Sequence, residues 1–157
     1  MGTFERIALS MDAEETLQYL RGRWRVRRDV TDHRAAEHGI FVGTATFSPH
    51  GETDARTLHF EEDGQMQLGS HEGRASRQLN YSVAGDRIAV MFSDGRHFID
   101  LDLRDGTSHA VHVCNIDRYE ITTVVKNPDL FEERWRVEGP EKDYQAVTTL
   151  ERVTDQL

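Results

Sequence analysis

The sequence predicts an all-β protein: an antiparallel up-and-down β-barrel of about ten strands with a short N-terminal helix. Two observations favour this fold class. Apolar and polar residues alternate from Gly22 onward with the period of a strand, and turn-forming residues recur between the alternating segments. Twisted strands without a second helical layer must split into a sandwich or close on themselves, and short sequential hairpins favour closure.

The length of the chain agrees with a single barrel. At 157 residues the chain is expected to form one domain over residues 1–157. The helix is expected at about 11–21 and the barrel at about 22–153. No repeat, low-complexity tract or linker divides the chain.

Residues 11–21, MDAEETLQYLR, predict the helix. Ser10 or Asp12 would cap its first turn, where a side-chain oxygen can accept a hydrogen bond from a free backbone N–H. Gly22 would end it, because glycine is the usual residue just beyond a helix.

The strands are predicted from segments that alternate in polarity. These segments are 24–30, 40–47, 57–60, 65–68, 77–83, 87–92, 96–103, 109–116, 118–125, 133–137 and 144–152. The turn signals are HGE (50–52), EDG (62–64), AGD (84–86), SDG (93–95), RDG (104–106), NPD (127–129) and EGP (138–140).

The charge balance excludes two classes of partner. The chain has 28 acidic and 19 basic residues, a formal charge of −9, which repels nucleic acid and anionic membrane surfaces. Cys114 is the only cysteine, so no intramolecular disulfide can form. With no signal-peptide pattern and no apolar run of roughly 20 residues, we expect a cytoplasmic protein. A homodimer is compatible with the sequence.

The predicted helix is followed by "GRW" at residues 22–24 and then by a long run of hairpins. This order of elements resembles the lipocalin and fatty-acid-binding (calycin) barrels. The resemblance implies that Gly22 and Trp24 open the first strand and that Trp24 plugs the closed end of the barrel. It also implies that Arg152, in "TTLER", packs across Trp24.

A closer resemblance is to a group of uncharacterised single-domain bacterial and fungal proteins with lipocalin-like barrels. It is carried by "DGRHF" (94–98), "HVCNIDRY" (112–119) and "RWRVEGPEKDY" (134–144), in that order. The resemblance spans most of the chain from Gly22 to Arg152. It implies the fold and carries no activity with it.

The stretch 108–120, SHAVHVCNIDRYE, concentrates residues that can do chemistry. His112 and Cys114 would share one face of a strand, whereas His109 would point the opposite way. A metal site is therefore not predicted, because zinc needs three or four convergent ligands. A bulge or turn near 115–117 could return Asp117 and Tyr119 to the side of His112.

Two further segments carry candidate residues near the open end of the barrel. In 96–103 the more apolar face, which includes His97 and Ile99, is the expected interior, and Asp94-Gly95 predicts a hairpin turn. Arg96 would be a cation at the rim or half of a surface pair with Asp100.

In 133–144, Trp135 would point opposite to its arginine neighbours, either into the core or towards a ligand. The turn at Gly139-Pro140 would place Lys142 and Tyr144 near the mouth of the barrel.

Small-molecule binding is the first functional hypothesis. The ligand would be largely apolar with an acidic or carbonyl group, because a barrel interior with polar groups is expected to hold solvent or a ligand. The residues assigned to this pocket are Tyr81, Phe92, Arg96, His112, Cys114, Tyr119, Trp135, Lys142 and Tyr144.

The alternative is a small cofactor-independent enzyme of the cyclase, isomerase or dehydratase type. His112 would act as the base, oriented by Asp117, and Tyr119 as the acid or oxyanion donor. A haem-binding barrel is a third reading, while no cofactor is predicted. The usual motifs of phosphate loops, serine hydrolases and helical zinc proteases are absent from the sequence.

Overall fold

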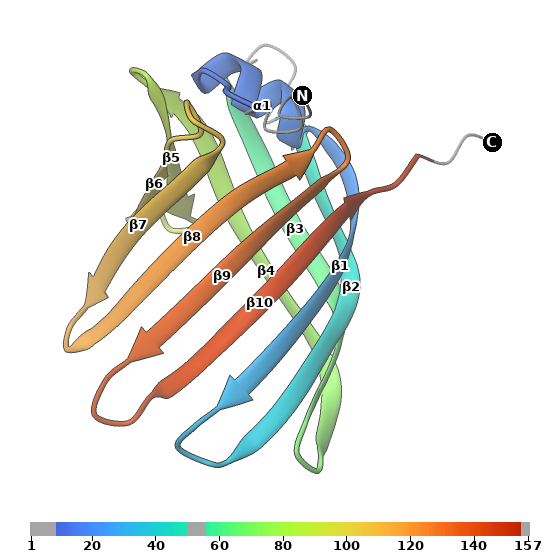
Figure 1. The fold of residues 1–157 in the computed structure, drawn as a ribbon, viewed down its shortest axis with the longest axis vertical. Helices are drawn as coiled ribbons and strands as arrows, with labels where there is room; N and C mark the ends of the chain where they lie inside the picture. Colours follow the sequence, from blue (N-terminus) through green and yellow to red (C-terminus); the bar gives the residue numbers. More distant parts are fainter. Residues whose placement is uncertain (1–8, 50–55, 155–157) are drawn as a thin grey trace, which may run out of the picture.

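The computed structural model describes residues 9–49 and 56–154 of the chain. Within these ranges it contains one helix and ten strands, and all ten strands lie in one sheet (Figure 1). The elements are α1 (Ala13–Leu20), β1 (Gly22–Asp32), β2 (Glu37–Pro49), β3 (Thr57–Leu68), β4 (His71–Ala84), β5 (Arg87–Phe92), β6 (His97–Leu101), β7 (Thr107–Cys114), β8 (Asp117–Asn127), β9 (Leu130–Glu138) and β10 (Asp143–Arg152).

The sheet curls into a nearly closed barrel. Its strand order is β6-β5-β4-β3-β2-β1-β10-β9-β8-β7, and every neighbouring pair is antiparallel. The end strands β6 and β7 are not hydrogen-bonded to each other, and they leave a seam in the wall. This arrangement confirms the predicted fold class.

The helix covers one end of the barrel (Figure 1). Asp12 is its N-cap: the Asp12 side chain accepts a hydrogen bond from the backbone N–H of Glu15 at 2.8 Å, and the Glu15 side chain accepts one from the N–H of Asp12 at 2.9 Å. This reciprocal capping box fixes the first turn. Leu17 and Leu20 point from the helix into the core. At eight residues, the helix in the described ranges is too short to cross a bilayer.

Trp24 lies at the centre of this closed end. Its side chain is fully buried, and its indole N–H donates to the carbonyl of Leu20 at 2.8 Å. The guanidinium of Arg152 lies 4.3 Å from the centroid of the Trp24 ring and donates to the carbonyl of Tyr19 at 2.8 Å. Gly22 has φ +127°, a value that favours glycine and allows the chain to leave the helix and enter β1 directly.

The prediction of separate strands at 57–60 and 65–68 is wrong, because both belong to the continuous strand β3. The EDG signal at 62–64 is not a turn. Gly64 lies opposite Gly43 of β2, and a Cβ built on Gly64 would come within 2.6 Å of the Gly43 Cα. Glycine therefore serves the close approach of two strands here.

Most of the other predicted turns are confirmed. Gly85, Gly95 and Gly106 have positive φ between successive strands, as turn glycines do, and NPD and EGP also separate strands. The HGE signal lies outside the described residues. Turns at 33–36 and 69–70 were not predicted.

The prediction that β6 alternates regularly is wrong at one point. Phe98 and Ile99 are both buried, whereas His97 is exposed. The register of β5 against β6 shifts between Val90, which pairs with Ile99, and Met91, which pairs with His97. This irregularity leaves Phe98 without a partner in the ladder and lets its ring turn inward.

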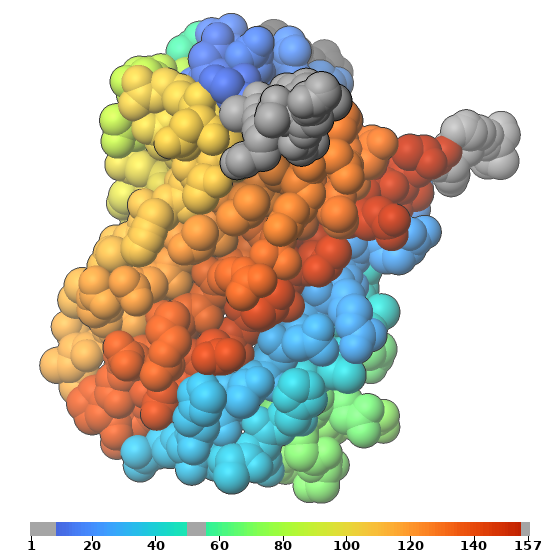
Figure 2. Space-filling view, viewed as in Figure 1, coloured from blue at the N-terminus to red at the C-terminus, as the bar shows by residue number. Residues whose placement is uncertain are grey.

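The interior changes in character along the barrel. Apolar side chains fill the end next to α1. Charged and hydroxyl side chains, including those of Arg28, Glu62 and Thr148, form the next layer towards the open end. The outer side chains of β7 to β10 and β1 cover the wall in the space-filling view, with the helix at its upper end (Figure 2). The charged layer therefore divides the apolar core from the open end.

Candidate functional site

A cavity of about 340 Å³ opens at the end of the barrel away from α1. Its lining residues belong to β1, β3, β4, β9 and β10. The hairpins β1–β2, β3–β4 and β9–β10 lie at the end of the barrel opposite the helix (Figure 1). The lining combines aliphatic, aromatic and charged side chains: Arg28, Val30, Asp32, Met66, Leu68, Arg77, Trp135, Tyr144 and Ala146. A mainly apolar wall with a few convergent polar groups is typical of small-molecule sites.

Glu62 of β3 anchors the floor of this cavity. Arg28 donates to both of its carboxylate oxygens, at 3.1 and 2.6 Å, and Arg77 donates through Nε at 3.1 Å. Burial alone would raise the pKa of Glu62, but the charges of Arg77 and Arg28 and their hydrogen bonds outweigh it and hold the pKa below its ordinary value. Arg28 Nε donates to Thr148 Oγ1 at 2.8 Å, so each of the three guanidinium nitrogens of Arg28 makes a hydrogen bond.

Arg77 of β4 is only partly engaged. Its guanidinium carbon lies 5.4 Å from the Phe60 ring centroid and 5.3 Å from that of Trp135. Nη2 faces Glu133 Oε1 at 3.8 Å, which is too long for a hydrogen bond. No described residue accepts a hydrogen bond from Nη1 or Nη2, and the side chain is 31% exposed. These N–H groups are available to a ligand.

Glu133 of β9 stands beside Arg77. Its Oε1 accepts a hydrogen bond from the indole N–H of Trp135 at 2.8 Å, whereas Oε2 has no hydrogen-bond partner among the described residues. The Glu133 side chain is 16% exposed. Burial, followed by the charge of Glu133, raises the pKa of the neighbouring Tyr81, so this hydroxyl stays neutral. Burial also raises the pKa of Tyr144 at the cavity wall.

Five consecutive strands contribute rings to one side of the open end. The ring of His112 (β7) lies 5.9 Å from Phe92 (β5), 5.2 Å from Phe98 (β6) and 6.0 Å from Tyr119 (β8), between ring centroids. Tyr119 in turn lies 6.0 Å from Trp135 (β9). The ring planes are inclined to one another by 58–83°, and aromatic rings in such tilted and edge-to-face arrangements attract one another.

The turn expected near residues 115–117 is present. Asn115 has φ +58°, and it joins β7 to β8 so that His112 lies opposite Tyr119 and Cys114 lies opposite Asp117. The structure therefore brings His112 and Tyr119 together, as the possible turn implied.

The contact expected between His112 and Asp117 does not form. Lys142 Nζ lies 3.3 Å from Asp117 Oδ2 and donates to the Tyr119 hydroxyl at 2.9 Å. These two bonds raise the pKa of Lys142. No hydrogen bond or ion pair links His112 to Asp117 in the described part of the chain, because the carboxylate is turned towards the β9–β10 hairpin.

Of the nine residues that the sequence assigned to the pocket, only Trp135 and Tyr144 line this cavity. Arg96 is exposed and pairs with Asp94 at 2.8 Å, and the expected pair with Asp100 is wrong because Asp100 binds His97 at 2.9 Å. Cys114 is exposed at the end of β7. Tyr81 is buried beneath the charged floor, whereas Tyr144 and Trp135 line the cavity itself.

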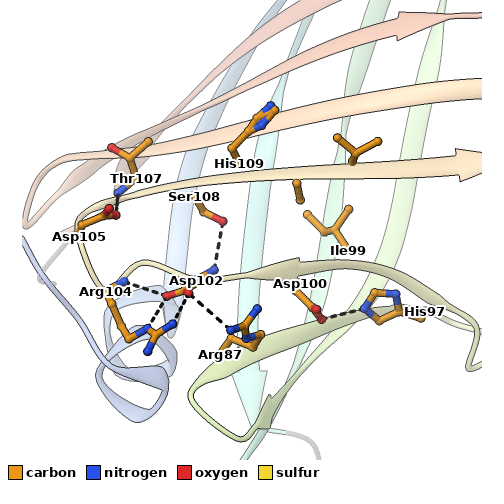
Figure 3. A pocket seen from close by; sticks show the side chains of 12 residues that line it. Arg87, His97, Ile99, Asp100, Asp102, Arg104, Asp105, Thr107, Ser108 and His109 are labelled. Carbon is orange, nitrogen blue, oxygen red and sulfur yellow. Dashed lines mark hydrogen bonds and ion pairs between the residues drawn. The ribbon is translucent and has the colours of Figure 1, made fainter.

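A second, larger cavity of about 680 Å³ lies in the seam between β6 and β7 (Figure 3). Asp102 binds Arg104 at 2.7 Å, with Arg87 4.0 Å away, and hydrogen bonds to Arg104 lower the pKa of Asp102 to about 2. The backbone N–H of Asp102, just after β6, donates to Ser108 Oγ of β7 at 3.0 Å. The charged side chains of this cavity are paired: Arg104 binds Asp102, His97 binds Asp100 at 2.9 Å, and His109 lies 3.7 Å from Glu120.

The described ranges, 9–49 and 56–154, contain no candidate metal site. No group of three His, Cys, Asp or Glu side chains in these ranges lies close enough together to hold an ion.

Sequence reasoning missed four residues of the site: Arg28, Glu62, Arg77 and Glu133. Each occupies the same strand face as buried apolar neighbours, as Arg28 does with Val26 and Val30. A charged residue at an apolar position of a strand was the signal that could have found them.

The comparisons place the chain in a known family. The family described as a family of unknown function, DUF6314, matches residues 20–152. The chain belongs to this family. The match covers the barrel and confirms the expectation of an uncharacterised family. Comparison with curated proteins gives no match.

Solved structures share the fold of this DUF6314 protein. The S-type phycobiliprotein lyase CPES from Guillardia theta superposes with a TM-score of 0.71 at 14% identity, over 98% of this chain and 99% of the other. A protein of unknown function of the DUF3598 family from Nostoc punctiforme superposes with a TM-score of 0.58 at 14% identity, over 87% of this chain and 49% of the other. These likenesses show a lipocalin-like barrel.

Proposed function

We propose that this protein binds a small, largely apolar molecule in the cavity at the open end of the barrel. The observation that carries the proposal is Arg77: it lines the cavity, and two of its nitrogens have no hydrogen-bond acceptor among the residues that the structure describes. A carbonyl or carboxylate of the ligand would accept from these nitrogens. Hydrogen bonds from a charged donor contribute about 1.5–3 kcal/mol each.

The remaining walls suit an apolar body. Val30, Met66 and Ala146 supply aliphatic surface, and Trp135 and Tyr144 supply rings. Removing apolar surface from water contributes about 25 cal/mol per Å², so the walls supply affinity and Arg77 fixes orientation.

The first experiment is native mass spectrometry of freshly purified protein beside its denatured mass. A small mass that is lost on denaturation supports the proposal and gives the composition of the ligand.

A fluorescence titration with the neutral probe N-phenyl-1-naphthylamine tests the location. We expect the probe to brighten with the natural protein and to lose most of this gain with Ala146→Trp or Met66→Trp, which fill the cavity. Val42→Trp, on the outer face of β2, is the matched control and should bind normally. Failure of the probe to bind, or equal binding by all four proteins, would count against the mouth as the binding site.

A further inference from the structure

We infer that the interior cavity, a small space inside the barrel on the helix side of the charged floor, binds one ordered water molecule. The polar residues that line the interior cavity are Arg28, Glu62, Arg77, Tyr81, Thr123, Glu133 and Thr148. Side chains of the apolar core, such as Leu20 and Phe131, complete its wall. This inference goes beyond the proposed function and does not depend on a ligand at the mouth.

A row of polar side chains crosses the inner face of four neighbouring strands. The strand register places Glu133 of β9 opposite Thr123 of β8 on one side and opposite Thr148 of β10 on the other. Thr148 in turn lies opposite Arg28 of β1. Directly paired residues point to the same face of a sheet and lie close together. The row therefore gathers hydroxyl and carboxylate groups on one wall of the interior cavity.

The protein itself satisfies only one end of this row. Arg28 Nε donates to Thr148 Oγ1 at 2.8 Å, and Glu133 Oε1 accepts from the indole N–H of Trp135 at 2.8 Å. At the other end, the Thr123 hydroxyl and Glu133 Oε2 have no hydrogen-bond partner in residues 9–49 and 56–154. Thr123 is only 4% exposed, so bulk water does not satisfy its hydroxyl.

Tyr81 of β4 adds a third polar group to the interior cavity. Its side chain is 8% exposed, and its ring packs against Phe47 and Phe60 at centroid distances of 5.2 and 5.9 Å. No residue in the described part of the chain forms a hydrogen bond with its hydroxyl. Burial, followed by the nearby charge of Glu133, raises the pKa of Tyr81, so the hydroxyl keeps its proton and can donate it in a hydrogen bond.

The three unpartnered groups border space that a water molecule can reach. Within the described ranges, every side-chain nitrogen or oxygen that packing shuts off from such space has a hydrogen-bond partner. The hydroxyls of Tyr81 and Thr123 and the Oε2 atom of Glu133 have none, so packing does not shut them off. The interior cavity that their residues line measures about 20 Å³, and roughly 10–15 Å³ is enough for one water molecule.

Water fits this site in both size and hydrogen bonding. A water molecule has two donors and two acceptor lone pairs, and a buried one typically makes about three hydrogen bonds. It can donate to Glu133 Oε2 and accept from the Tyr81 hydroxyl, while the Thr123 hydroxyl can take either role. A dry cavity would leave all three groups unpaired in the interior, which is unfavourable.

Oxygen-17 magnetic relaxation dispersion tests the inference, because it counts water molecules that stay bound for longer than the protein takes to rotate. The double variant Tyr81→Phe/Thr123→Val nearly keeps the shape of both side chains and removes two of the three partners. We expect its dispersion amplitude to be smaller than that of the natural protein by the contribution of one water molecule. Equal amplitudes, or a natural protein without any long-lived water, would overturn the inference.

The double variant Tyr19→Phe/Thr16→Val is the matched control. The Tyr19 hydroxyl donates to the carbonyl of Asn127 at 2.9 Å, and the Thr16 hydroxyl donates to the carbonyl of Asp12 at 2.8 Å. The protein supplies both acceptors, so we expect this variant to keep the full dispersion amplitude. The same loss in both double variants would reflect a general loosening of the barrel and would also overturn the inference.

Urea unfolding gives a second readout, whose sign separates a hydrated cavity from a dry one. If the hydroxyls of Tyr81 and Thr123 bind water, their removal breaks hydrogen bonds and the midpoint urea concentration should fall. If they are unpaired in a dry cavity, their removal ends an unfavourable burial and the midpoint should rise. We expect a fall in Tyr81→Phe/Thr123→Val, and a rise would overturn the inference.

Discussion

Arg28 of β1 and Glu62 of β3 form a two-point ion pair across the inside of the barrel, although β2 separates their strands. On β2, Phe41 lies opposite Arg28 and Ala45 lies opposite Glu62, and Gly43 is between them; the small Gly43 and Ala45 leave space for the two side chains to meet. The Arg28 guanidinium rests 4.9 Å from the centroid of the Phe41 ring. The floor of the cavity is therefore built by charges whose partners are set by strand register.

Loss of the Glu62 carboxylate should destabilise the fold. In Glu62→Gln, Arg28 and Arg77 remain in the interior without their counter-charge. Breaking a buried ion pair from one side costs about 3–5 kcal/mol, and we expect the lower end because both arginines are partly exposed. Urea unfolding measures the change. Glu61→Gln, one residue away on the exposed face of β3, is the control and should lie close to the natural protein.

The carboxylate of Glu62 should make the free energy of unfolding depend on pH in the acidic range. The pKa of Glu62 is lower in the folded protein than the value of 4.5 for an unperturbed glutamate, so the unfolded state binds more protons between the two values. The stabilisation by Glu62 is complete above about pH 4.5 and is lost as the pH falls through the folded pKa. Unfolding free energies measured from pH 7 to pH 3 should fall less steeply for Glu62→Gln. Parallel curves for the two proteins would contradict this assignment.

The close approach of β2 and β3 should not tolerate a side chain. A Cβ at Gly64 would lie 2.6 Å from the Gly43 Cα and 2.8 Å from the Phe41 ring, so Gly64→Ala must push the strands apart. We expect a loss of about 2 kcal/mol from this overpacking. In Gly73→Ala the added Cβ meets nothing within 4 Å, and its melting temperature should match that of the natural protein.

Arg152 should stabilise the closed end through its planar guanidinium. It covers Trp24 and donates to the carbonyls of Tyr19 and Pro128 at 2.8 and 3.0 Å. Arg152→Met keeps part of the apolar stem but loses these bonds, and we expect a cost of about 2 kcal/mol. Arg25→Met removes only an exposed pair with Glu151, and thermal unfolding should barely detect it. Equal losses in both variants would refute the special role of Arg152.

The fold could be predicted because it depends on local signals. Alternation marks the strands, and glycines such as Gly85 and Gly95 mark the turns between them. The exceptions are informative. Gly64 signals a turn in sequence but serves a close contact between β2 and β3, which is visible only once Gly43 is known to lie opposite.

The site could be predicted only in part. The alternation of side chains along a strand predicted that His112 shares a face with Ala110. In the structure, the turn at Asn115 brings Tyr119 opposite His112. The charged floor could not be assembled from the sequence, because Arg28 and Glu133 come from strands far apart in the chain. A single charged residue at an apolar position interrupts the alternation of a strand. Its ion-pair partner can be identified only when the strand register is known.

The unequal lengths of the strands determine how a molecule reaches the cavity. Strand β4 has 14 residues, whereas β5 and β6 have only 6 and 5. The short strands lie near the helix end, so the barrel wall on this side does not extend to the open end (Figure 1). A molecule bound as proposed would therefore keep one side in water while its other side contacts Trp135. Entry can be sideways, and a compound longer than the cavity can be held by one end.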